Sequence, residues 1–233
     1  MHPIQKNQVF LLHFAGGNSR SFHFLRPYKP NDYEFHFLEL PGRGKRIGES
    51  LLDTEPEAID DLFTQIKQLR NNKPYVIFGH SMGACLALTI TKKMEQMNDA
   101  PSRLIVAGNA GPGTGDTKKR SGYSDEAMKE ELLSLGGVPK EVLENEDLFN
   151  FFSPVMRADF KVVEDFESSD MDFKVRTPII ALMGDIEETV EEIENWKNFT
   201  IGMFKTRLLP GNHFFINDHP AELVKIMTQS GVL

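Results

Sequence analysis

Short apolar runs alternate with longer segments of helical periodicity along the chain. Apolar residues recur at helical spacing in segments 55–69, 84–97 and 221–227, which predict helices. Short, fully apolar runs between such segments are typical of buried strands in a parallel sheet. The alternation predicts an α/β fold with a mostly parallel central sheet flanked by helices. The runs that predict strands are 9–14, 33–38, 75–78, 104–107, 179–183 and 204–209.

The stretch from about 112 to 172 interrupts this alternation because it holds no good strand. Gly136-Gly137 and Pro154 are expected to separate its helices. We expect a single domain over 1–233 in which this stretch is a helical lid inserted between two strands. A rigid packing element without a gating role is the alternative. The helical patterns of the insertion lie at 125–135, 140–152 and 155–166.

Composition and charge argue against a nucleic-acid-binding protein, a disulfide-bonded protein and a membrane protein. The net charge of −8 disfavours nucleic-acid binding, which needs clustered Lys and Arg. Local basic clusters at 43–46 and 118–120 are expected to be solvated surface. Cys85, the single cysteine, cannot form an internal disulfide. No apolar stretch approaches the ~20 residues that a membrane span needs, so we expect a cytoplasmic protein without a membrane anchor.

The pentapeptide Gly79-His80-Ser81-Met82-Gly83 is the most informative string in the sequence. It directly follows a predicted strand and directly precedes a predicted helix, which is the context of a nucleophile elbow in an α/β-hydrolase fold. The two glycines keep the crowded turn free of side chains. We therefore expect Ser81 to be a covalent nucleophile and His80 to be a structural neighbour, with a chance Gly-Ser turn as the alternative.

A serine hydroxyl needs a base, and the base needs a carboxylate to orient it. In this fold the nucleophile, the acid and the histidine follow one another along the chain. His213 lies in the loop after the last predicted strand and is the candidate base, whereas His219 is expected to be a capping or surface residue. The acid should follow strand 179–183, where Asp185 and Glu187 are both available.

The oxyanion of an acyl-transfer reaction needs two backbone amides. One is expected from Met82, the residue after the nucleophile. The other should come from the loop 13–17, whose glycines allow the backbone to approach a substrate closely. We expect the amide of Ala15 in this role, with Phe14 as the alternative. This chemistry requires neither a metal nor a redox cofactor.

Taken together, these strings resemble the type II thioesterases, the stand-alone thioesterases that accompany nonribosomal peptide and polyketide synthases. The resemblance covers nearly the whole chain. Its residues are His13-Phe14-Ala15-Gly16-Gly17, Glu39-Leu40-Pro41-Gly42-Arg43-Gly44, Gly79-His80-Ser81-Met82-Gly83, Leu135-Gly136-Gly137, Arg157-Ala158-Asp159-Phe160 and Gly211-Asn212-His213-Phe214-Phe215.

The resemblance implies hydrolysis of acyl or aminoacyl thioesters on the phosphopantetheine arm of acyl or peptidyl carrier proteins. The implied role is to remove wrong or stalled acyl groups and so restore the synthase. The family places its acid in a Gly-x-x-Asp pattern, and alignment on Gly184 puts Glu187 at that position, so this sequence departs from Asp to Glu. The resemblance therefore favours Glu187 over Asp185.

Three other functions are compatible with the elbow. A carboxylesterase or lipase would act on a free small-molecule ester, a transferase would replace water by another nucleophile, and a binding module would keep a relict triad. The carrier-family strings argue against the first, and an intact Ser81 and His213 argue against the last. We expect a monomer, with the basic run 118–120 as a candidate contact for an acidic carrier protein.

Overall fold

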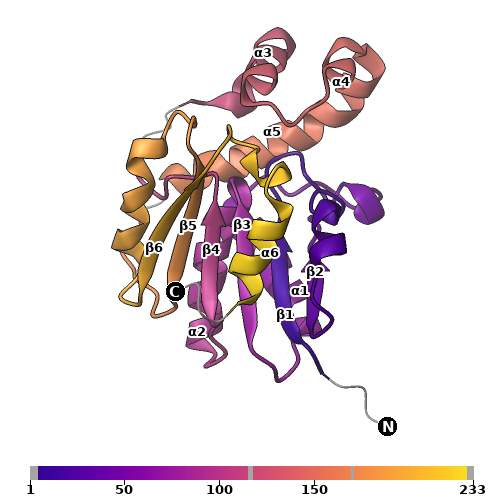
Figure 1. Cartoon of the computed structure of the whole chain (residues 1–233). Helices are drawn as coiled ribbons and strands as arrows, with labels where there is room; N and C mark the ends of the chain where they lie inside the picture. Colours follow the sequence, from indigo (N-terminus) through magenta and orange to yellow (C-terminus); the bar gives the residue numbers. More distant parts are fainter. Residues whose placement is uncertain (1–4, 115–117, 169–170, 230–233) are drawn as a thin grey trace.

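Six strands form one all-parallel sheet in the order β2-β1-β3-β4-β5-β6 (Figure 1). The computed structural model describes residues 5–114, 118–168 and 171–229. The predicted α/β-hydrolase fold with a parallel sheet flanked by helices is confirmed. The strands are β1 Asn7–Leu12, β2 Tyr33–Phe37, β3 Tyr75–His80, β4 Arg103–Ala107, β5 Ile179–Gly184 and β6 Phe204–Leu209.

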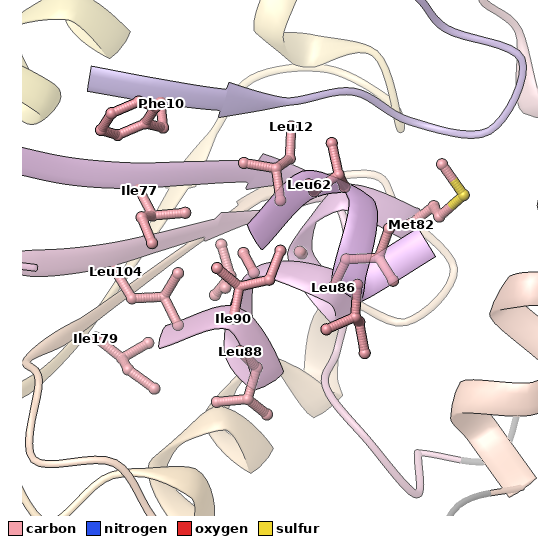
Figure 2. Close-up of a cluster of buried hydrophobic side chains, with 14 of the residues drawn as sticks. Phe10, Leu12, Leu62, Ile77, Met82, Leu86, Leu88, Ile90, Leu104 and Ile179 are labelled. Atoms are coloured by element: carbon pink, nitrogen blue, oxygen red, sulfur yellow. The ribbon is translucent and has the colours of Figure 1, made fainter. Parts of the chain in front are cut away.

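Helices cover both faces of the sheet because alternate strand residues point to opposite sides. Phe10, Ile77 and Leu104 point into the apolar cluster that these strands share with α1 and α2, part of which Figure 2 shows. Leu11 and Val76 point to the opposite face, which α6 covers (Figure 1). The helices outside the insertion are α1 Glu55–Leu69, α2 Met82–Gln96 and α6 Pro220–Thr228, with 3-10 segments η1 His23–Tyr28, η2 Gly44–Arg46, η4 Val190–Phe199 and η5 Phe215–Asn217.

The segment between β4 and β5 is helical and lies beyond the carboxyl edge of the sheet (Figure 1). Its buried side chains, among them Met128, Leu132, Phe149 and Met156, form a separate apolar cluster. A gating role for this segment stays a prediction. Its elements are η3 Arg120–Gly122, α3 Asp125–Leu135, α4 Lys140–Glu144 and α5 Glu146–Ser168.

The expected helix break at Pro154 is wrong, because α5 continues through this residue. The break lies earlier, where the side chain of Asn145 accepts a hydrogen bond of 3.0 Å from the amide of Leu148 and caps the new helix. A proline inside a helix costs about 3 kcal/mol. Burial of Phe149, Met156 and similar side chains on one face of α5 stabilises the folded state by roughly 1.5–3 kcal/mol each. Together these contributions exceed the cost of the proline.

No helix in the described ranges is long and apolar enough to cross a membrane.

Candidate active site

The predicted site residues follow four different strands, and the sheet brings them to one edge. Because all strands are parallel, the loops after β1, β3, β5 and β6 emerge at the same carboxyl edge. The chain moves from β1 to β2 on one side and then returns to β3 on the other side. Loops diverge at such a switch point and leave a crevice between them. The segment 13–17 and Ser81 border this crevice.

Ser81 sits in a strained backbone conformation at the turn between β3 and α2. Its φ of 55° and ψ of −117° lie outside the regions that side-chain-bearing residues favour. A Cβ on Gly79 would approach the carbonyl oxygen of Gly83 to 2.1 Å, and one on Gly83 would approach that of Leu12 to 2.2 Å. Both flanking glycines are therefore required sterically, and the turn presents Ser81 at the head of α2.

His213 contacts Glu187 rather than Asp185. The Nδ1 atom of His213 lies 3.0 Å from Oε2 of Glu187, whose side chain is only 6% exposed. The other oxygen of Glu187 accepts a hydrogen bond of 3.1 Å from the amide of Gly184. Asp185 is exposed and accepts instead from the amide of Gly211 at 2.9 Å. With Nδ1–H donating to a carboxylate, the His213 ring leaves Nε2 free to accept a proton.

Ser81 and His213 line the same cavity. Within the described ranges no hydrogen bond joins the Ser81 hydroxyl to the His213 ring. Contacts between a nucleophile and its base are often loose without substrate and tighten in the reactive complex. Ser81 and His213 therefore border one cavity, and their roles as nucleophile and base stay a prediction.

The backbone amides proposed for the oxyanion lie at two elements. Met82 is the first residue of α2, so its amide has no intrahelical acceptor and shares the partial positive charge of the helix start. In the loop after β1, the amide of Gly17 donates to Phe14 and that of Gly16 donates to Asp159. Among the described residues this leaves the amides of Phe14 and Ala15 without a protein acceptor. Their role stays a prediction.

His80 lies directly beside His213, with 5.0 Å between the ring centroids. Its ring is fully buried, and neither nitrogen has a hydrogen-bond partner in the described part of the chain. Burial, reinforced by the charge of His213, holds the pKa of His80 well below its usual value. Gly108, at φ 60°, makes room for this ring, since a Cβ there would come within 2.4 Å of Cε1 of His80. His80 is therefore a neutral packing residue beneath His213.

An apolar cavity of about 380 Å³ opens above Ser81. It lies between the core and the helical insertion. None of the described residues that line it is Asp, Glu, Lys or Arg, and His213 is the one titratable side chain among them. A ligand in this cavity would therefore meet mostly hydrocarbon. The insertion contributes Leu132, Leu135, Val138, Val142, Phe152 and Met156.

A buried ion pair next to the site was missed by the sequence interpretation. Arg43 and Asp159 form a bidentate pair, with Nη1 2.5 Å from Oδ2 and Nη2 2.7 Å from Oδ1. Their side chains are 4% and 0% exposed. The expectation that the cluster 43–46 is solvated surface is therefore wrong for Arg43. The strings Pro-Gly-Arg-Gly and Arg-Ala-Asp-Phe had marked both residues, but no local pattern joins them across 116 positions.

The second basic cluster is also paired. Lys118 and Arg120 both contact Glu131 of α3, at 3.4 and 2.8 Å. Arg120 is largely buried, with 12% of its side chain exposed. These contacts reduce the positive charge that the run 118–120 presents to a partner. In the described ranges no group of three or more His, Cys, Asp or Glu side chains is arranged to hold a metal ion.

The chain is similar to a known protein family and to characterised relatives over most of its length. Residues 7–230 match the family described as Thioesterase domain. The probable cadicidin biosynthesis thioesterase of Streptomyces griseus is 30% identical over 222 residues, which cover 94% of this chain and 61% of that protein. The medium-chain S-acyl fatty acid synthase thioesterase of Rattus norvegicus is 31% identical over 211 residues, covering 87% of this chain and 79% of the relative.

A solved structure shows the same fold. YbtT, described as the type II thioesterase from the yersiniabactin NRPS/PKS biosynthetic pathway, superimposes with a TM-score of 0.86. The two sequences are 25% identical, and the match covers 97% of this chain and 92% of YbtT. The likeness therefore includes the helical insertion as well as the sheet.

Proposed function

This chain belongs to the thioesterase domain family, and we propose that it hydrolyses acyl thioesters on the phosphopantetheine arm of carrier proteins. Its relatives include thioesterases of biosynthetic pathways and of fatty acid synthase. The proposed role is to release wrong or stalled acyl groups from a nonribosomal peptide, polyketide or fatty-acid-like synthase. The proposed working form is a cytoplasmic monomer that needs no cofactor of its own.

The proposed mechanism is covalent catalysis by Ser81. Nε2 of His213 takes the hydroxyl proton while Oγ attacks the thioester carbonyl carbon, and Glu187 stabilises the resulting imidazolium. The amides of Met82 and Ala15 donate to the oxyanion. Collapse of the tetrahedral intermediate breaks the C–S bond, and the proton on His213 passes to the leaving thiolate. Water then attacks the acyl-enzyme carbonyl while the same ring takes its proton. Collapse of this second tetrahedral intermediate breaks the bond to Oγ, the proton passes from His213 to Oγ, and the acid and free Ser81 are released.

The contact between Glu187 and His213 is the observation that carries this proposal. A carboxylate, 6% exposed and held by the amide of Gly184, faces Nδ1 of a histidine that shares a cavity with the strained Ser81. A nucleophile, a base and a carboxylate that orients the base are the three roles of an acyl-transfer site. The cavity itself supports an uncharged, apolar acyl group as the substrate.

The test compares one acyl group in two linkages. The chain is incubated with an acyl carrier protein bearing that group as a thioester, and with a small oxygen ester of the same group. We expect the carrier thioester to be cleaved with the higher kcat/KM, and Ser81→Ala to abolish both activities. A preference for the oxygen ester would favour a carboxylesterase instead. A phosphonate that fails to label Ser81 would contradict the enzyme mechanism altogether.

A further inference from the structure

The ion pair between Arg43 and Asp159 touches the loop that is proposed to hold the oxyanion. We propose that Asp159, on the insertion helix α5, is a positioning residue that holds the backbone of Ala15 and Gly16 in the geometry needed to stabilise the oxyanion. This inference rests on the proposed function, because it gives a role to a contact beside the proposed reaction centre. It assigns part of the catalytic geometry to the helical insertion rather than to the sheet.

The contact is direct and buried. Oδ2 of Asp159 accepts a hydrogen bond of 2.7 Å from the amide of Gly16. Arg43 occupies both carboxylate oxygens from the other side, and its Nη1 also donates to the carbonyl of Gly17 at 3.4 Å. The ion pair therefore forms hydrogen bonds with the loop backbone at two successive residues, Gly16 and Gly17. Asp159 is fully buried, so no solvent competes for these bonds.

Helix α5 and a tight turn restrain the same loop. Gly16 has a φ of 75°, and a Cβ there would lie 2.1 Å from Sδ of Met156 and 2.7 Å from Cζ of Phe152. The loop backbone is therefore pressed against one face of α5. The amide of Gly17 closes the turn onto the carbonyl of Phe14 at 2.9 Å. With the Gly16 and Gly17 amides both used, the preceding amides are the ones that remain for a substrate.

The chemistry of the pair fits a positioning role. A hydrogen bond from an amide to an ionised carboxylate is shorter and stronger than one to a neutral acceptor, so it defines the direction of the peptide plane. That plane joins Ala15 to Gly16 and so sets the orientation of the neighbouring amides. Arg43 neutralises the carboxylate, which would otherwise repel an oxyanion formed nearby. A neutral pair holds the loop without opposing the charge that develops.

The test uses Asp159→Asn, which keeps the size of the side chain but removes its charge. We expect kcat for acyl-carrier hydrolysis to fall about 10- to 100-fold, with KM within about threefold, because the oxyanion forms only after binding. Affinity for a trifluoromethyl ketone, which reacts with Ser81 to give an oxyanion, should fall by the same factor as kcat/KM. Lys161→Gln is the matched control, since it breaks the exposed pair of α5 with Asp53. It should leave all three quantities unchanged.

If Asp159→Asn does not fold, the double variant Arg43→Gln with Asp159→Asn removes both buried charges and is tested in the same way. Unchanged kcat in the folded variant overturns the inference. A loss of kcat without the matching loss of ketone affinity overturns it as well, because it indicates a general structural defect. Different results would contradict this inference and the proposed function. A wild-type protein that cleaves p-nitrophenyl esters but no carrier thioester contradicts the proposed substrate, and the variants still test the oxyanion loop on the ester.

Discussion

At the scale of single residues, the acid of the proposed triad depends on side-chain reach. Asp185 and Glu187 are two positions apart in one loop, and only the longer side chain contacts His213. The turn in which the amide of Glu187 donates to the carbonyl of Gly184 points that side chain inward. The exposed Asp185 instead ties this loop to Gly211. Glu187 thus contacts the proposed base, while Asp185 joins the loop after β5 to the loop after β6.

Replacing each carboxylate by its amide separates these roles. Glu187→Gln should lower kcat/KM at least about 100-fold, because a neutral amide cannot stabilise the imidazolium form of His213. Asp185→Asn keeps an oxygen that can accept from Gly211, and kcat/KM should stay within about threefold of the wild type. Steady-state hydrolysis of one acyl-carrier thioester measures both variants. A larger loss in the aspartate variant would reverse the assignment of the acid.

A second prediction at this scale concerns the buried His13. Its Nδ1 pairs with the carbonyl of Phe14 at 2.9 Å, and its Nε2 accepts from the amide of Leu40 at 3.5 Å, so the native ring is neutral. Burial, together with the charge of Arg43, lowers the pKa of His13 from 6.5 to about 4. In the unfolded chain this residue takes up a proton near pH 6.5. The free energy of unfolding should therefore fall as the pH drops from about 6.5 to about 4, by up to about 3 kcal/mol.

Urea unfolding at several pH values measures this effect. His13→Gln removes the titrating group, so its free energy of unfolding should depend less steeply on pH over the same window. The buried His80 has its pKa shifted in the same direction, and the difference between wild type and variant isolates His13. Parallel pH profiles for the two proteins would contradict the assignment.

At the scale of elements, the junction of β3 and α2 owes its shape to close backbone contacts. Helix α2 begins so near the end of β1 that Gly83 has no room for a side chain. The small residues Ala84 and Ala87 continue this close approach, and both are fully buried. The helix start, which supplies the amide of Met82, is therefore held rigidly against the sheet.

The steric requirement at Gly83 can be tested by adding one methyl group. In Gly83→Ala the new Cβ would meet backbone atoms of Leu12 and His13, which cannot move aside independently. We expect the free energy of unfolding to drop by about 1–3 kcal/mol and kcat to fall with it. Gly122→Ala is the control, because no heavy atom lies within 4 Å of a Cβ at that position. A Gly83 variant as stable and active as the control would show that the elbow tolerates a displaced helix.

Helix α5 links the insertion to the catalytic edge of the sheet. Its buried residues include Phe149, Met156 and Asp159, and Asp159 accepts a hydrogen bond from the loop after β1. Any opening of the insertion that moved α5 would break this contact. We therefore expect movement to be confined to α3 and α4, whose contacts with the core are weaker. If the insertion opens as a lid, we expect α3 and α4 to be the parts that move.

At the scale of the whole molecule, the described cavity wall is apolar while the chain as a whole carries a charge of −8. No acidic residue of the described ranges lines the space above Ser81. A cationic group buried in such a cavity would lose its hydration without gaining a carboxylate partner. The charge of the acyl group should therefore matter more than its length alone.

Three thioesters of one carrier protein test this discrimination. An octanoyl thioester should be hydrolysed with a kcat/KM at least about tenfold above that of a leucyl thioester, whose α-ammonium is charged. N-acetylation of the leucyl group removes this charge and should recover most of the difference. Val142→Asp, which puts a carboxylate in the cavity wall, should reduce the preference. Equal rates for all three substrates would mean that the ammonium stays in solvent.

Much of the architecture follows from local sequence. Short stretches of sequence are enough to predict the strands and helices, the turn around Ser81 and the position of His213 after the last strand. This is because backbone propensity and turn sterics act over only a few residues. The order of the catalytic loops then follows from the parallel sheet. This explains why the fold and the nucleophile could be predicted together.

Other features depend on the tertiary structure. The family resemblance already favoured Glu187 over Asp185, but the contact with His213 depends on where one loop places the two side chains. The continuation of α5 through Pro154 depends on the apolar surface that the helix buries. The pairing of Arg43 with Asp159 joins residues 116 positions apart, so no sequence window contains both. Burial in the folded chain turns these distant side chains into neighbours, and only there can their charge hold the loop beside Ser81.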